Sequence, residues 1–191
     1  MNGEGRVVTA KQEAQWVLRA QCDDREALES LLRSVEPPLF RYVRGLVGED
    51  DAEDVLQDVL ILICRNLAFL HTPELFRPWI YRIASRESFR HLRKQKRRPD
   101  RGLDEPVPLE ELAVSAVAPS TEMLESLIEA DTLTPASRAV LALHFQQELS
   151  LPEVSAILEI PLGTVKSRLA SGLAALRKHL AMKGNVNDRR S

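Results

Sequence analysis

Residues 82–98 carry a regular series of cationic side chains, eight Lys or Arg with a single Glu. On a helical wheel one aromatic and five arginines recur at spacings of three and four, which places them on one face. This arginine stripe consists of Trp79, Arg82, Arg86, Arg90, Arg93 and Arg97. Like charges at such spacings destabilise their own helix, whereas a bound polyphosphate relieves the repulsion and releases counterions. The stripe therefore favours a nucleic-acid ligand, although an ordinary solvated face stays open as the alternative.

A second group of polar side chains lies on a predicted helix over residues 162–180. Opposite its apolar stripe the helix carries Thr164, Ser167, Arg168 and Ser171, and Lys166 lies beside this polar face. Cations near the start of an inserted helix can reach phosphates or base edges, and hydroxyls can donate to phosphates. We assign Lys166 to a phosphate, which a helix start also favours.

A short helix is predicted immediately before that segment. Ser150 is followed three residues later by Glu153, with Pro152 in the first turn, and this pattern is typical of a capping box. Two helices joined by the tight turn at residues 159–163 predict a helix-turn-helix whose second helix enters the major groove. A plain helical hairpin with a wet polar face is the competing interpretation.

Catalytic and metal chemistry find no support in the residue spacings. The histidines are scattered through the chain, at His71, His91, His144 and His179. Cys22 and Cys64 lack metal-ligand spacing, and we expect two buried, reduced thiols. The sequence therefore predicts a protein that is not an enzyme and that needs no metal, cofactor or small-molecule substrate.

Length and composition set the class of protein. The chain has 191 residues and a formal net charge of −2, which suits one ordinary domain or two small ones in a soluble fold. No apolar run is long enough to span a membrane, and the polar start MNGEGRVVTAKQEAQ lacks the apolar core of a signal peptide. We therefore expect a cytosolic protein.

The helix signal is strong throughout and the strand signal is nearly absent, so we expect an all-α fold. Residues 100–131 contain nine acidic residues against one Arg, together with several prolines. This composition is typical of a flexible linker. We predict four segments: a first helical domain over 10–100, an acidic linker over 101–123, a second helical domain over 124–183 and a disordered tail over 184–191.

The segment DDAEDVLQDVLILICRN, residues 50–66, predicts an amphipathic helix of a different kind. Its polar face gathers Glu53, Asp54, Gln57 and Asp58, and Leu60 with Ile61 widens the apolar surface beyond one stripe. Exposed apolar residues beside acids indicate a protein partner with basic groups. The helix dipole alone also favours acids in the first turns, which is the structural alternative.

These three elements, in this order, resemble the extracytoplasmic-function group of bacterial RNA polymerase sigma factors, which keep only the second and fourth conserved regions of the larger family. The resemblance covers about residues 23–180. DDAEDVLQDVLILICRNL is similar to the polymerase-binding helix of region two, and FRPWIYRIASRESFRHLRKQKRR to its promoter-melting segment. LTPASRAVLALHFQQELSLPEVSAILEIPLGTVKSRL is similar to region four.

The resemblance implies a role for each segment and a set of partners. The acidic helix would dock on a coiled coil of the polymerase beta-prime subunit through Asp54, Gln57, Asp58, Leu60 and Ile61. Residues 71–79 would accept a base flipped out of the minus-ten element, stacked on Phe76 or Trp79, although Trp79 is equally suited to a core role. The helix from about Gly163 would bind the minus-thirty-five element. The implied partners are core RNA polymerase, through its beta-prime and beta subunits, promoter DNA and an anti-sigma factor that is often bound to the membrane.

The chain departs from the family pattern at informative positions. Arg86 stands where relatives often have a base-contacting Asn, and Arg90 replaces a frequent Asp. Ser171 and Leu173 stand where many relatives have Arg. We therefore predict stronger phosphate contact in region two, and weaker contact in region four, than is usual among relatives. A stand-alone helix-turn-helix regulator that binds duplex DNA as a dimer is the alternative to a sigma factor.

Overall fold

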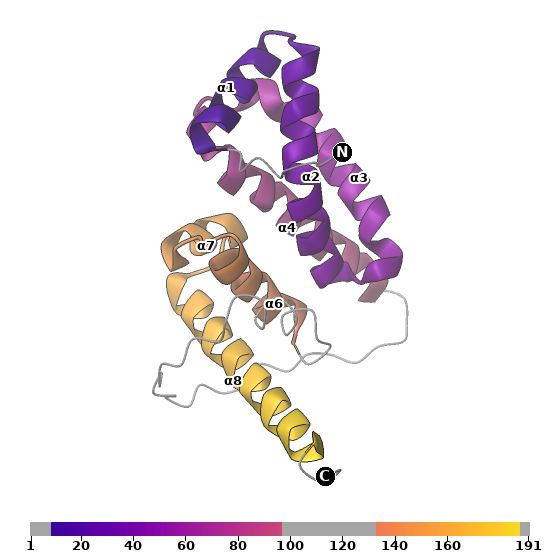
Figure 1. Ribbon diagram of the computed structural model, residues 1–191, viewed down its shortest axis with the longest axis vertical. Helices are drawn as coiled ribbons and strands as arrows, with labels where there is room; N and C mark the ends of the chain where they lie inside the picture. The colour runs from indigo at the N-terminus through magenta and orange to yellow at the C-terminus, as the bar shows by residue number, and fades with distance from the viewer. Residues whose placement is uncertain (1–8, 97–132, 188–191) are drawn as a thin grey trace. The chain divides into compact units, whose positions relative to one another are not determined.

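The computed structural model describes residues 9–96 and 133–187, with side chains for 9–95 and 133–180. Within these ranges the regular secondary structure is entirely helical, as the sequence predicts. The described residues divide into two compact units, the first holding residues 9–44 and 48–91 and the second residues 45–47, 92–96 and 133–187 (Figure 1). No helix of the described residues combines the length and the apolar character needed to cross a membrane.

Four helices and two short 3-10 turns build the first unit, and the last residues of the second and fourth of these helices belong to the second unit. In chain order they are α1 (Ala10–Gln21), α2 (Arg25–Val47), α3 (Glu49–Asn66), η1 (Leu67–Phe69), η2 (Pro73–Leu75) and α4 (Phe76–Lys96). The loop that connects α3 to α4 covers residues 67–75 and contains the two 3-10 turns η1 and η2.

Local side chains decide where the first helices begin. The Thr9 hydroxyl accepts a hydrogen bond from the Gln12 N–H at the start of α1, and the Asp24 carboxylate accepts one from the Ala27 N–H at the start of α2. The Ala27 N–H and the Arg19 guanidinium together hold the pKa of Asp24 below its ordinary value. Gly48, with a φ of 92°, allows the sharp change of direction between α2 and α3.

The core of the first unit contains two buried tyrosines that pack against each other. The rings of Tyr42 on α2 and Tyr81 on α4 meet edge to face with centroids 5.3 Å apart. The Tyr42 hydroxyl shares a 2.7 Å hydrogen bond with the Ser85 hydroxyl. Burial raises the pKa of both tyrosines, so both stay neutral and act as packing groups that fix α4 against α2.

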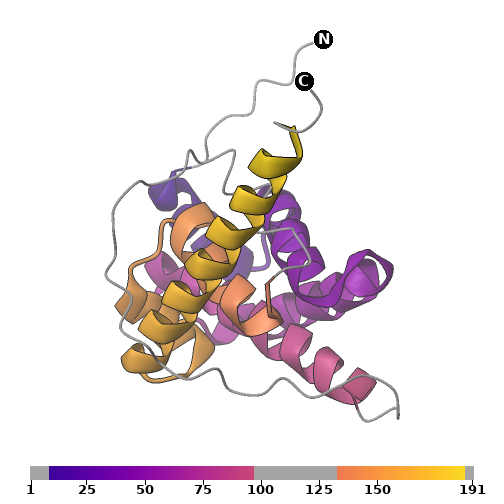
Figure 2. The same ribbon diagram turned by 90° about the horizontal axis from the view of Figure 1, so that it is seen from below.

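The second unit contains α6 (Pro135–Leu141), a π-helical turn at Ala142–Gln146, α7 (Leu151–Leu158) and α8 (Leu162–Asn187). Figures 1 and 2 show α6 and α7 lying beside α8. The capping box predicted for Ser150 and Glu153 is confirmed, with both reciprocal hydrogen bonds present and Pro152 in the first turn. Glu159 ends α7 in the left-handed conformation, at φ 56°, and so forms the tight turn into α8.

Helix α8 packs closely against α6 at a glycine. A Cβ placed on the buried Gly172 would lie 2.7 Å from Cδ1 of Leu141, which is itself fully buried. Val165 and Leu176 of α8 and Ile157 of α7 are also buried. Helices α7 and α8 pack against each other.

Two predictions about the chain are corrected. Cys22 and Cys64 are free, but both are exposed and not buried. Cys22 follows the last residue of α1, where the chain turns, and Cys64 lies on the outer side of α3, opposite the core residues Val59 and Ile63. The predicted tail over 184–191 is also too long, because α8 continues to Asn187.

The linker predicted over 101–123 lies outside the described residues, as do Arg97 and the first residues of the second domain predicted from 124.

Candidate nucleic-acid and polymerase interfaces

The described part of the arginine stripe, Trp79 to Arg93, lies on α4 with unequal exposure along its length. Arg86, Arg90 and Arg93 are exposed, whereas Arg82 is half-buried and its Nε atom is enclosed. Trp79, at the head of the stripe, is also half-buried. The cationic surface of α4 is therefore concentrated in its C-terminal half.

Arg90 meets two carboxylates within its own unit. Its guanidinium forms an ion pair with Glu87 one turn earlier and lies 3.6 Å from the Asp58 carboxylate on α3. The fold therefore brings acids to the stripe at this position, and they relieve part of the repulsion between its arginines. Both Arg90 and Asp58 are at least half-exposed, so this pair adds little to stability.

A groove of about 340 Å³ lies between α3, η1 and α4. Its walls combine apolar and polar side chains and consist of Leu62, Asn66, Phe69, Trp79, Ile83, Arg86 and Glu87. Phe69 is 72% exposed at the rim. An exposed aromatic ring beside a guanidinium is the surface on which an unpaired base can stack.

Of the two aromatic residues predicted for that task, Trp79 lines this groove and Phe76 does not. Phe76 is only 1% exposed and packs on Trp79, with ring centroids 6.2 Å apart. It is a core residue in this structure, while Trp79 both contacts the core and lines the groove. The sequence interpretation missed Phe69, and its only signal is an aromatic residue in the short stretch that joins two amphipathic helices.

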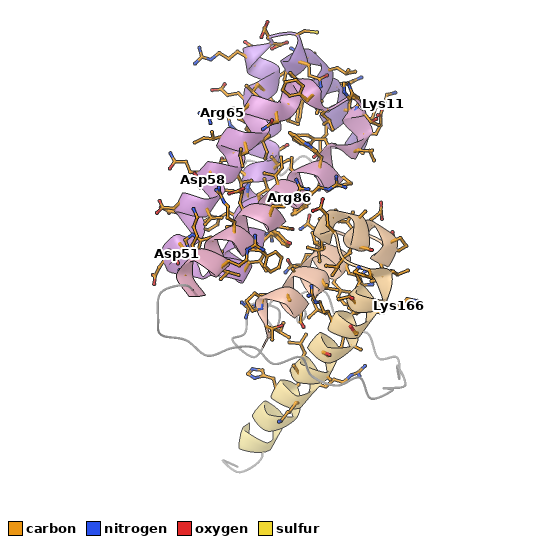
Figure 3. The ribbon with its side chains drawn as sticks, turned by 180° about the vertical axis from the view of Figure 1, so that it is seen from behind. Lys11, Asp51, Asp58, Arg65, Arg86 and Lys166 are labelled. Atoms are coloured by element: carbon orange, nitrogen blue, oxygen red, sulfur yellow. The ribbon has the colours of Figure 1, made fainter. Side chains whose placement is uncertain are left out.

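The acidic helix α3 presents the residues that the sequence indicated. Asp54, Gln57 and Asp58 are exposed, Leu60 is half-buried and Ile61 is 41% exposed. Asp51, Asp58 and Arg65 follow one another along the same side of the helix (Figure 3).

An open apolar groove of about 590 Å³ runs between α2 and α3. It is lined by Glu36, Pro37, Phe40, Glu53, Leu56, Gln57 and Leu60. The structure thus joins Gln57 and Leu60 to Phe40 of α2, a contribution that the sequence interpretation did not foresee. An apolar floor with acids at its margins suits a basic helical partner.

The polar residues predicted for α8 differ in their exposure to solvent. Lys166 and Ser171 are exposed, and Lys166 lies at the start of the helix (Figure 3). Thr164, Ser167 and Arg168 are half-buried, and the Ser167 hydroxyl donates to the Thr164 carbonyl at 3.0 Å. Lys166 is therefore the most accessible cation of this surface.

Comparison with known proteins identifies the family of this chain. The family model Sigma-70 region 2 matches residues 31–98, and Sigma-70, region 4 matches residues 130–178. The ECF RNA polymerase sigma factor SigW of Bacillus subtilis (strain 168) is 30% identical over 82% of this chain and 90% of its own length. The chain belongs to the ECF RNA polymerase sigma factors.

Other relatives agree with this membership. The RNA polymerase sigma-H factor of Pseudomonas aeruginosa is 28% identical over 91% of this sigma factor and 96% of its own length. Among solved structures, CnrH in complex with the cytosolic domain of CnrY matches with a TM-score of 0.61 and 20% identity, over 91% of this chain and 99% of CnrH. The sigma factor RpoE from Bartonella quintana matches with a TM-score of 0.61 and 22% identity, over 80% of this chain and 96% of the RpoE chain. These two likenesses show the fold.

The predicted all-α fold with region 2 and region 4 units is confirmed. This sigma factor directs DNA-templated transcription initiation by RNA polymerase, and a stand-alone helix-turn-helix regulator is not favoured.

Proposed function

We propose that this sigma factor docks on core polymerase through the groove between α2 and α3, holds unpaired minus-ten DNA against α4, and reads the minus-thirty-five duplex with α8. The observation that carries the proposal is the groove rimmed by Phe69, Trp79 and Arg86, beside the exposed arginines of α4. RNA synthesis itself belongs to the polymerase, and the sigma factor contributes no catalytic group.

At the minus-ten element, strand opening is assisted because the separated state gains contacts that the duplex lacks. A flipped base can stack on Phe69 and reach Arg86 and Glu87, which line the same groove. Stacking of one base on an aromatic side chain contributes about 1–3 kcal/mol. Arg90 and Arg93 follow on the same helix and can hold the phosphates of the strand.

At the polymerase, we propose that the coiled coil of the beta-prime subunit lies along the groove of α2 and α3. Phe40, Leu56 and Leu60 supply the apolar contact, and Asp54, Gln57 and Asp58 supply acceptors for basic side chains. Ile61 extends this surface, and the beta subunit is the further contact expected of the sigma factor. The acids guide orientation and association rate more than they add affinity.

At the minus-thirty-five element, Lys166 and Arg168 are the proposed cationic contacts of α8, with Thr164, Ser167 and Ser171 as hydroxyl donors. The Ser167 hydroxyl already donates to a backbone carbonyl, so its bond to DNA must replace that one. This supports a weaker contact in region four than is usual among relatives.

We also propose that the protein works in the bacterial cytoplasm under the control of an anti-sigma factor, which can hold it at the membrane. One structural neighbour, RpoE from Bartonella quintana, was solved with the anti-sigma factor NepR. The apolar groove of α2 and α3 would have to be covered in such an inactive complex, since polymerase needs the same surface.

Run-off transcription with purified core polymerase tests the proposal. We expect the full chain to restore transcription from a promoter that the holoenzyme selects from random DNA. Asp54→Arg should lower the yield at least about tenfold, because a reversed charge against a basic partner costs several kcal/mol. Glu29→Arg, the same charge change at an exposed position of α2 outside the groove, is the matched control. Equal yields for the two variants with unchanged circular dichroism would contradict the docking surface.

A further inference from the structure

Helix α1 holds one end of the loop that carries Phe69. The Gln21 side-chain amide donates to the Leu67 carbonyl at 2.8 Å and to the Leu70 carbonyl at 2.9 Å. These two carbonyls bracket the η1 turn, so a single side chain fixes the turn from both sides. Leu67 and Leu70 are themselves buried, and of the two exposed residues between them, Ala68 and Phe69, only Phe69 carries a large side chain.

The other end of the loop is held by a charged pair. The Arg77 guanidinium donates to both Glu13 oxygens, from Nε at 2.8 Å and from Nη2 at 2.6 Å. Glu13 is only 3% exposed, and a buried carboxylate is tolerated when it is paired in this bidentate way. Arg77 lies at the start of α4, two residues before Trp79.

The two contacts enclose the segment that forms the rim of the proposed base-stacking groove. Between them the chain exposes Phe69 and Leu75, at 72% and 54%. Large apolar side chains are held in water here by polar contacts at the ends of the loop. A loop ordered before its ligand arrives loses less conformational entropy on binding.

We infer that α1 is a clamp that presets the minus-ten loop, with Gln21 and Glu13 as positioning residues that hold Phe69 and Trp79 toward an unpaired DNA strand. The inference rests on the proposed role of the loop in binding that strand. Neither residue contacts DNA in this mechanism. Both precede residues 31–98, which the region 2 family model matches.

Hydrogen exchange of the free, full-length protein tests the clamp without DNA. The Leu70 and Leu75 amides donate hydrogen bonds within the loop and report on its order. In Gln21→Met and in Glu13→Gln we expect them to exchange about tenfold faster, with the amides of α2 and α3 unchanged. Arg19→Ala is the matched control, since it breaks an ion pair of α1 with Asp24 and leaves the loop contacts intact. Unchanged exchange in both variants would overturn the clamp.

DNA binding tests whether the clamp contributes to binding of the unpaired minus-ten strand. The probe is a fluorescent oligonucleotide with the non-template minus-ten strand of a promoter selected by the holoenzyme. Holoenzyme with Gln21→Met should bind it about tenfold more weakly, and duplex minus-thirty-five DNA equally well. If Phe69→Ala weakens binding while both clamp variants bind normally, the positioning role is overturned and the proposed function stands. If Phe69→Ala binds normally, the proposed role of the loop fails, and the exchange data alone decide the clamp. Thermal unfolding confirms that each variant is folded.

Discussion

At the scale of single residues, two phenylalanines seven positions apart have opposite environments. Phe76 is buried against Trp79 and Phe69 is exposed at the rim of a groove. The sequence pointed to Phe76 because it lies beside the cationic helix. The sequence does not indicate which of the two phenylalanines is buried, because burial depends on how α1 and α3 pack against the loop. The same holds for Cys22 and Cys64, whose exposure follows from the exact helix ends and faces.

This difference gives a paired prediction. Phe69→Ala should weaken binding of unpaired minus-ten DNA by about tenfold, within the 1–3 kcal/mol of one stacking contact, and leave the stability unchanged. Phe76→Ala should lower the free energy of unfolding by about 3–5 kcal/mol, because it opens a cavity in the core. Fluorescence anisotropy and urea unfolding measure the two effects. Leu75→Ala removes an exposed apolar side chain outside the groove and is the control for Phe69; equal losses from both would contradict the stacking role.

At the scale of elements, the sequence predicted contacts between residues close in the chain but not contacts between residues far apart in the chain. The start of α7 was predictable because Ser150, Pro152 and Glu153 act within one turn. The helix-turn-helix followed from that start and from the stripe of α8. By contrast, Gln21 and Leu67 are 46 positions apart, and Glu13 and Arg77 are 64 positions apart. Nothing in the spacing of the polar residues of α1 indicates such partners.

Two glycines of α8 allow a prediction about its packing. Gly172→Ala should lower the free energy of unfolding by about 1–2 kcal/mol, because overpacking against Leu141 exceeds the gain in helix propensity. Gly163→Ala is the matched control in the first turn of the same helix, where an added Cβ meets no atom within 4 Å. That variant should be neutral or slightly more stable. Thermal or urea unfolding of the full chain compares them, and equal stability of the two would show that the contact of α8 with α6 can relax.

At the scale of the whole molecule, a net charge of −2 conceals surfaces of opposite sign. The sequence showed this because the acids of α3 and the arginines of α4 occupy separate stretches. It did not show that an acid of α3 forms an ion pair with an arginine of α4. Asp58, proposed for the polymerase contact, lies 3.6 Å from Arg90, proposed for the DNA contact. A promoter phosphate at Arg90 therefore competes with acids of the same unit.

The salt dependence of promoter binding by the holoenzyme should distinguish the arginines of the stripe. Each phosphate neutralised on a single strand contributes about 0.7 to the slope of log K against log salt. Arg93 is exposed and has no ion pair with another residue of the described ranges, so Arg93→Ala should reduce the slope by about that amount. Arg90→Ala should reduce it less, because Glu87 and Asp58 already neutralise part of its charge. Lys11→Ala on α1 is the control and should leave the slope unchanged. A larger reduction for Arg90→Ala than for Arg93→Ala would mean that DNA displaces both acids, and that the phosphate path follows Arg90.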